Sequence, residues 1–400
     1  MKFRTRRCIW ACIWAICFLG TPSLWAEPKG RFHIEVMTPR ALEAFTPGGP
    51  PDQFPYQHGL YNGLIVSPGT FVPEQSGFFK FNVDNNGYFS GNMITGDYST
   101  PLYGYFDYQG EVWLYIYEKE WDDCYCYYYL RHVWTVHMQV TAGSNEIEGS
   151  VYHVRLGWLS DLFGYAGRRS ENGTAPENGR YTLRLPGSAD PVTAPAGDGY
   201  GSVTVSTVGQ VKISGKLADN ASFSQSVTIS TNGWWPFYVS FHDGRGSLIG
   251  WLNFSLQPDS DVAGDLFWAK PSRSDAQYYP DGFTGTIHAT GARYSKPGST
   301  ETPLGWTNGL AYISGGNLLG PATNSVTMRP GNKFTDNGGG LGNLTFSLNT
   351  GTGVFKGKFT HPDTGKRMSY SGALHQLTAV GTGFFMDRDQ GGFFGLQAVP

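Results

Sequence analysis

Cysteine is nearly absent from the part of this 400-residue chain that we expect to fold. Three of the five cysteines lie within the first 17 residues, which leaves only Cys124 and Cys126. One close pair cannot form the framework of a small disulfide-rich domain, so the fold must rest on apolar cores. A disulfide between the two is strained if both lie in one strand, and stays open as an alternative if Cys124 lies in a loop.

Charged residues are also scarce, at 15% of the chain. Residues 1–26 combine four basic residues, an apolar stretch and a small residue, Ala26, at a candidate cleavage site, which predicts a secretory signal peptide. Without those four, 25 of the 29 basic residues remain against 32 acidic ones, a net charge of −7. This balance argues against nucleic acid as a partner.

Long apolar runs are missing beyond this segment, because no other stretch of 18 apolar residues could span a membrane as a helix. We therefore expect a soluble exported protein, located in the periplasm, at the cell surface or in the medium. Between the predicted signal and the first strands, residues 27–50 form a lead-in segment.

The motifs of common enzyme classes are missing as well. The sequence contains no Gly-x-Ser-x-Gly elbow, His-Glu-x-x-His motif, phosphate-binding loop or dinucleotide fingerprint. We therefore expect a protein that is not an enzyme and that uses no cofactor. An alternative is a secreted hydrolase acting on polysaccharide, because glycoside hydrolysis needs a pair of neighbouring carboxylates. The candidates are Glu118, Glu120, Asp122 and Asp123.

Glycine, in contrast, is abundant, with 55 residues in the chain, about twice the usual share. One pattern occurs three times: two runs of alternating apolar and polar residues joined by a glycine-containing turn, which predicts a β-hairpin. The copies span residues 77–93, 201–217 and 342–359. Recurrence on this scale predicts a chain built from repeated β-meander units.

These hairpins predict an all-β fold of two tandem antiparallel β-meander modules. Residues 51–187 form module 1, and residues 198–400 form module 2 with two internal multi-strand repeats. Residues 188–197, rich in proline, glycine and alanine, form the linker. Closure removes exposed sheet edges and favours barrel-like modules; a two-sheet sandwich is the alternative.

The hairpins, together with Asn178-Gly-Arg-Tyr-Thr-Leu183 and Gly246-Ser-Leu-Ile-Gly-Trp251, carry a resemblance. The chain resembles the glycine- and aromatic-rich β-meander modules of large secreted bacterial proteins of uncharacterised function. The resemblance covers most of the chain after the predicted signal. It rests on structural glycines and core residues, so it implies an architecture and brings no catalytic residues with it.

The segment 111–130 is unusually aromatic. If residues 118–123 form the loop of a hairpin, three aromatic pairs face one another on one side of it. The pairs are Trp113 with Tyr129, Tyr115 with Tyr127, and Tyr117 with Tyr125. The opposite side pairs Val112 with Leu130, Leu114 with Tyr128, and Ile116 with Cys126, and we expect it to face the core.

An outward stripe of six aromatic rings is larger than a monomer normally exposes without a use. The stripe predicts a binding surface for sugar rings or another flat ligand. The competing interpretation is packing of the rings between the two modules or against the lead-in segment. The expected partners are therefore a polysaccharide or another surface protein, and the expected role is binding or surface-structural.

Two further alternatives remain from the sequence. Asp259, Asp261 and Asp265 are closely spaced in a predicted loop and form a weak candidate for a calcium site; no other metal site is expected. The glycine and aromatic content also suits an outer-membrane β-barrel.

Overall fold

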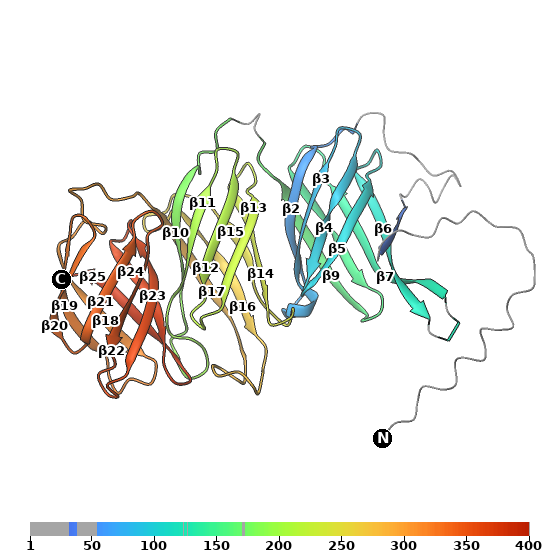
Figure 1. Cartoon of the computed structure of the whole chain (residues 1–400). Helices are drawn as coiled ribbons and strands as arrows, with labels where there is room; N and C mark the ends of the chain where they lie inside the picture. The colour runs from blue at the N-terminus through green and yellow to red at the C-terminus, as the bar shows by residue number, and fades with distance from the viewer. Residues whose placement is uncertain (1–31, 38–53, 123, 126, 170–172, 400) are drawn as a thin grey trace, which may run out of the picture.

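The chain folds into three sheets that lie side by side in a row (Figure 1). The computed structural model describes residues 32–37, 54–122, 124–125, 127–169 and 173–399, so the predicted signal peptide lies outside the described residues. Apart from one turn of 3-10 helix, η1 (Pro73–Gln75), the regular structure within these residues is all β. No helix in the described part of the chain has the length and apolar character to cross a bilayer.

The N-terminal barrel contains nine strands in the order β1-β6-β7-β8-β9-β2-β3-β4-β5. Its strands are β1 (Phe32–Met37), β2 (Gly59–Val66), β3 (Gly77–Val83), β4 (Tyr88–Thr95), β5 (Tyr98–Tyr105), β6 (Glu111–Asp122), β7 (Tyr127–Val140), β8 (Glu146–His153) and β9 (Trp158–Ala166).

The middle barrel contains eight strands in the order β13-β12-β11-β10-β17-β16-β15-β14. Its strands are β10 (Gly179–Leu185), β11 (Gly199–Val205), β12 (Gln210–Lys216), β13 (Ser222–Thr228), β14 (Trp234–Phe241), β15 (Gly246–Asn253), β16 (Val262–Lys270) and β17 (Phe283–Arg293).

The C-terminal barrel contains eight strands in the order β20-β19-β18-β25-β24-β23-β22-β21. Its strands are β18 (Asn308–Gly315), β19 (Ala322–Arg329), β20 (Lys333–Gly339), β21 (Gly342–Asn349), β22 (Val354–Thr360), β23 (Arg367–His375), β24 (Val380–Met386) and β25 (Gly391–Ala398).

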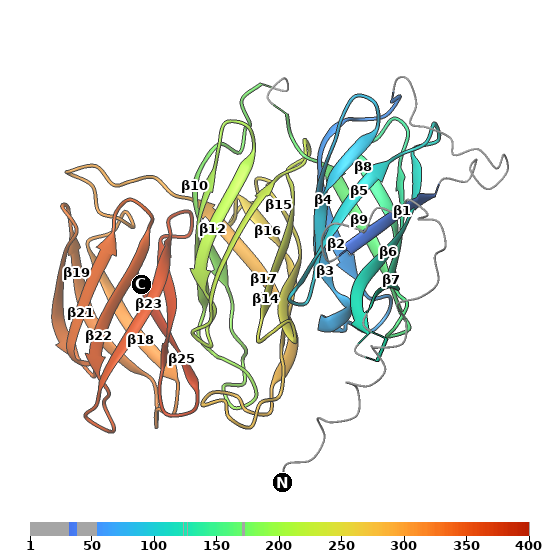
Figure 2. The same ribbon diagram turned by 45° about the vertical axis from the view of Figure 1, so that its right-hand side comes forward.

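Each sheet curls until the two ends of an eight-strand meander meet. The first and last strands of the meander pair antiparallel, as β2 with β9, β10 with β17, and β18 with β25. Each ladder is interrupted once inside the meander. The interruption lies between β13 and β14 in the middle barrel and between β20 and β21 in the C-terminal one, and in both places the strands still lie side by side. In the N-terminal barrel β1 pairs with β6 and lies beside β5 (Figure 2).

The expectation of an all-β, barrel-like fold is confirmed, whereas the division into two modules needs correction. The predicted second module contains two separate barrels, because β17 closes on β10 and β25 closes on β18. The strand β10, predicted as the end of module 1, belongs to the middle barrel and pairs with β11 across residues 186–198. The alternation of residues locates strands but does not show which distant strands pair with each other. Residues 188–197 within this long connection were therefore predicted to be a linker between modules.

Alternation along the strands fills the barrels with apolar side chains. In β22, Phe355 and Phe359 are fully buried inside the C-terminal barrel, whereas Lys356 and Lys358 between them are exposed on its outside. The same period of two places Val203 and Val205 of β11 inside the middle barrel. Each barrel has its own cluster of buried apolar residues, so polar and aromatic side chains on the outer faces are available for other roles.

Neighbouring barrels also pack against each other. Strands β2 and β3 and η1 of the N-terminal barrel lie against the middle barrel, where the rings of Phe71 and Phe267 are 4.2 Å apart. At the other end, Thr182 Oγ1 donates a hydrogen bond of 2.6 Å to the carbonyl oxygen of Leu374. Phe384 of β24 extends into the core cluster of the middle barrel. The three barrels are thus joined by buried contacts at two interfaces.

One glycine recurs at the same point of each repeated hairpin, and the structure explains why. A Cβ atom at Gly91, Gly215 or Gly357 would overlap a carbonyl oxygen of the neighbouring strand. At Gly357 it would also overlap the hydroxyl of Tyr370, whose ring lies across β22. This hydroxyl donates a 2.7 Å hydrogen bond to the carbonyl oxygen of Thr345. The recurring glycine therefore allows close approach of backbone and ring inside the barrel.

We expect Gly357→Ala to lower the free energy of unfolding by about 1–3 kcal/mol, because the added methyl group has no space. The matched control is Gly285→Ala in β17, where a Cβ would meet nothing within 4 Å and the change should be within about 0.5 kcal/mol. Urea unfolding of both variants measures the difference. Equal midpoints for the two variants would contradict the tight packing of Tyr370 on β22.

Candidate ligand-binding surface

The aromatic segment forms a long hairpin, β6–β7, whose turn lies further along the chain than expected. Strand β6 continues to Asp122, which pairs with Tyr127, so the predicted loop at 118–123 is mostly strand. The register also shifts once, because Ile116 pairs with Trp134 and Tyr117 pairs with His132. Val133 is the extra residue of this β-bulge, and it moves even-numbered residues of β7 onto the face of odd-numbered residues of β6.

The predicted aromatic pairs are therefore wrong. Trp113 faces His137, Tyr115 faces Thr135 and Tyr117 faces His132. Tyr127 and Tyr129 face Asp122 and Glu120 on the opposite side of the hairpin, and Tyr125 lies in the turn. These partners differ from the predicted ones because β7 contains a bulge and β6 is longer than expected. Neither feature alters the alternation of aromatic and aliphatic residues from which the pairs were predicted.

The predicted core face is confirmed for β6 and corrected for β7. Val112, Leu114 and Ile116 are fully buried in the N-terminal barrel. They pair with Met138, Val136 and Trp134 rather than with Leu130, Tyr128 and Cys126. Tyr128 is instead 55% exposed, and Cys126 lies outside the described residues.

The outer face of β6 and β7 gathers the rings that remain. We call it the aromatic face; its members are Trp113, Tyr115, Tyr117, Trp121, Tyr128, His132 and His137. Trp113 stacks on His137 with ring centroids 4.4 Å apart, and both Tyr115 and Tyr117 contact the ring of His132. The first three rings along β6 are half-buried, and Tyr117 also lies beside His33 of β1, with ring centroids 6.1 Å apart.

Two carboxylates hold these rings in place. Glu111 Oε1 accepts hydrogen bonds from Trp113 Nε1 at 3.1 Å and from His137 Nε2 at 2.9 Å. Glu35 Oε2 of β1 accepts a 3.2 Å hydrogen bond from the Tyr117 hydroxyl. Burial, followed by the nearby Glu35 carboxylate, raises the pKa of Tyr117, so this phenol stays protonated and remains a donor at neutral pH.

The aromatic face continues to the tip of the hairpin, which projects beyond the barrel (Figure 1). There Trp121 packs edge to face on Tyr128 at 4.8 Å, and Lys119 Nζ lies 4.3 Å from the centre of the Tyr128 ring. Trp121 and Tyr128 are 48% and 55% exposed. This pair differs from the sequence-based expectation, in which Trp121 lies in a loop and Tyr128 faces the core.

The position of the hairpin bears on the alternative that these rings pack between modules. The middle barrel contacts β2, β3 and η1, whereas β6 and β7 lie at the end of the row away from it (Figures 1 and 2). Strand β1 of the lead-in region pairs with the edge of β6 and adds Glu35 to the face. The aromatic face is therefore not part of the interface between barrels.

Two of the four acids of the hydrolase alternative, Glu120 and Asp122, form hydrogen bonds that support the hairpin. Glu120 accepts hydrogen bonds from Arg131 Nη1 at 2.8 Å and from the Tyr129 hydroxyl at 2.7 Å. The hydrogen bond between Tyr129 and Glu120 is the main reason that the pKa of Tyr129 is raised. Asp122 Oδ1 accepts from the backbone amides of Cys124 and Tyr125 and so supports the turn. Asp123 lies outside the described residues.

The weak calcium candidate is not supported by the geometry. Asp261 Oδ2 accepts the backbone amide of Arg293 at 2.7 Å, and Asp265 Oδ1 contacts His288 Nδ1 at 2.7 Å. Among the described residues, no three His, Cys, Asp or Glu side chains, Asp259 included, are grouped so that they could hold a metal ion. Cys124 is exposed near the hairpin tip; a bridge to Cys126 stays a prediction.

Comparison with known proteins gives only distant structural similarities. No protein-family model and no curated protein matches the chain. A mutant of the vaccine antigen transferrin-binding protein B from Haemophilus parasuis is 9% identical, with a TM-score of 0.23, over 87% of this chain and 77% of that one. Isotype 1 transferrin-binding protein B from Neisseria meningitidis is 10% identical, with a TM-score of 0.21, over 88% and 77%.

A protein with unknown function from the DUF3598 family of Nostoc punctiforme is 8% identical, with a TM-score of 0.17, over 86% of this chain and 96% of that one. Superpositions at these scores do not establish a shared fold.

The tip of the aromatic face should be dispensable for folding. We expect the double change Trp121→Ala/Tyr128→Ala to lower the free energy of unfolding by less than about 1 kcal/mol, the scale of one exposed cross-strand pair. Trp134→Ala should cost about 3–5 kcal/mol, because Trp134 is 5% exposed and packs on Trp158 at 5.3 Å. Thermal or urea unfolding compares them, and a similar loss for both would show that the tip rings serve packing.

Proposed function

We propose that the protein is a non-enzymatic binding protein that recognises carbohydrate through the aromatic face of β6 and β7. The observation that carries the proposal is the combination of half-buried aromatic rings with carboxylates held in fixed positions beside them. Trp113 donates a hydrogen bond to Glu111, and Tyr117 donates one to Glu35. Both side chains remain partly exposed to solvent. Sugars present apolar C–H faces surrounded by hydroxyl groups, and both can be satisfied here.

The spacing of the rings favours an extended ligand. Successive aromatic residues on one face of a strand are about 6.6 Å apart, and Trp113, Tyr115 and Tyr117 follow this spacing along β6. Across the sheet from Tyr115, Thr135 of β7 is followed by Tyr152 of β8, which is 39% exposed. Because the face runs onward to the hairpin tip, a polysaccharide chain fits it better than a single sugar.

The interior of each barrel is filled, so a ligand would bind to the outer faces. Apolar side chains fill the three interiors, whereas an outer-membrane barrel places its apolar band outside and a polar lining inside. The outer-membrane alternative is therefore not favoured by this distribution of side chains.

The experiment compares glycan binding by two double variants of the same hairpin, one on the aromatic face and one outside it. We expect Trp113→Ala/Tyr115→Ala to weaken binding of a retained polysaccharide at least about tenfold, because burying apolar ring surface contributes roughly 25 cal/mol per Å² and about 1.4 kcal/mol is a tenfold change in affinity. Tyr127→Ala/Tyr125→Ala, which removes two rings outside the aromatic face, should leave binding unchanged.

A glycan array followed by affinity electrophoresis on the best ligand provides the measurement. Unfolding midpoints of both variants serve as the control for stability. If no glycan is retained, or if both variants lose binding equally, carbohydrate recognition by the aromatic face is wrong.

A further inference from the structure

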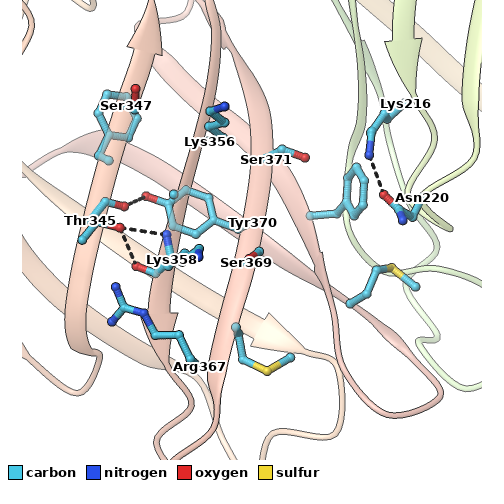
Figure 3. Close-up of a pocket in the computed structure, with 15 residues that line it drawn as sticks. Lys216, Asn220, Thr345, Ser347, Lys356, Lys358, Arg367, Ser369, Tyr370 and Ser371 are labelled. Carbon is cyan, nitrogen blue, oxygen red and sulfur yellow. Dashed lines mark hydrogen bonds between the residues drawn. The ribbon is translucent and has the colours of Figure 1, made fainter.

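A groove lined by basic and hydroxyl side chains lies between the middle and C-terminal barrels (Figure 3). One wall is the outer face of β21, β22 and β23, and the other is the end of β12 with the turn that follows it. The groove has a volume of about 650 Å³. A second section of about 560 Å³ shares Lys216, Ser347 and Lys356 with the first, so the two form one elongated groove.

Strand alternation and register produce the C-terminal wall. In β22 the buried Phe355 and Phe359 leave Lys356 and Lys358 on the outer face. Across the sheet, Lys356 lies between Ser347 of β21 and Ser371 of β23. Lys358 lies in the same way between Thr345 and Ser369. Each ammonium group therefore has a hydroxyl-bearing residue on both sides, as Figure 3 shows.

The wall from the middle barrel repeats this chemistry. Lys216 of β12 lies beside Ser222 of β13, and Ser214 lies beside Ser202 of β11. These residues line the second section of the groove. Hydroxyl groups can donate to anionic oxygens, and lysine offers three donors together with a positive charge.

The groove is positively charged, and no acidic side chain among the described residues pairs with its cations. The four cations are Lys216, Lys356, Lys358 and Arg367, and the described residues that line both sections include no aspartate or glutamate. Lys216 Nζ donates to the neutral Asn220 Oδ1 at 2.9 Å, and Arg367 Nη1 donates to the backbone carbonyl of Asn343 at 2.7 Å. Within the described part of the chain, none of the four forms a salt bridge.

This local excess contrasts with the chain as a whole, which has 32 acidic and 29 basic residues. Four neighbouring cations repel one another, and their repulsion is relieved when an anion enters the groove. The groove is thus complementary to a ligand that carries several negative charges along its length.

We propose that this groove binds an acidic polysaccharide, with its carboxylate or sulfate groups on Lys356, Lys358 and Lys216. Serine and threonine side chains on both walls match the hydroxyl groups between the charges. Nucleic acid fits less well, because single-stranded binding uses exposed rings for base stacking, whereas Tyr370 and Phe384 in this groove are buried. The site is separate from the aromatic face and does not depend on it.

The test measures binding of heparin, as a sulfated probe, and polygalacturonate, as a carboxylated probe, to the chain without residues 1–26. The groove variant is Lys356→Gln/Lys358→Gln. The control, Lys333→Gln/Lys296→Gln, removes the same charge from two exposed lysines outside the groove. We expect the groove variant to bind at least one probe about tenfold more weakly or worse, and the control to stay within about twofold of the parent chain.

Two further measurements test whether binding depends on charge and whether the groove prefers polysaccharide to nucleic acid. Binding of the acidic polysaccharide should weaken as sodium chloride rises, because salt screens the charges, and Trp113→Ala/Tyr115→Ala should leave it unchanged. Equal loss in the groove and control variants, no binding of either probe, or tighter binding of single-stranded DNA than of both polysaccharides would overturn the proposal. Loss in the aromatic-face variant alone would assign acidic-glycan binding to the other site.

Discussion

Closure of each sheet by pairing of its first and last strands is the constraint on which the rest of the structure depends. Strands β2 and β9, β10 and β17, and β18 and β25 are far apart in the chain and adjacent in space. Once they pair, alternate side chains on every strand point either into an enclosed apolar core or outward. The inside provides stability, and the outside carries the groups that can recognise a ligand.

The outer faces differ in chemistry because the barrels are joined in a row. Apolar rings such as Phe71 and Phe267 are used where the N-terminal and middle barrels meet. The aromatic face lies at the end of the row away from the middle barrel (Figure 1), and the basic groove lies between the middle and C-terminal barrels. Two surfaces with distinct chemistry thus arise from one repeated architecture.

Much of the fold could be predicted from the sequence, because its alternation and turn glycines are local signals. The hairpins around Gly91, Gly215 and Gly357 and the buried Val112, Leu114 and Ile116 were predicted in this way. The number of barrels was not, because strand closure is a long-range contact. The aromatic face was predicted only in part. The bulge at Val133 places Tyr128 on this face and moves Tyr127 and Tyr129 to the opposite one, and nothing in the sequence pattern indicates a bulge at this position. The basic groove needs two barrels to form it, so neither lysine-bearing strand could reveal it alone.

Hydrogen–deuterium exchange resolved by peptide tests the closure of the barrels most directly. The account predicts that backbone amides paired between β10 and β17, at residues 181–184 and 290–293, exchange as slowly as those paired between β11 and β12 at residues 200–205 and 211–216. Strands β13 and β14, which flank the interruption of the ladder, should exchange faster. Fast exchange in β10 and β17 beside a protected β11–β12 hairpin would contradict a closed middle barrel.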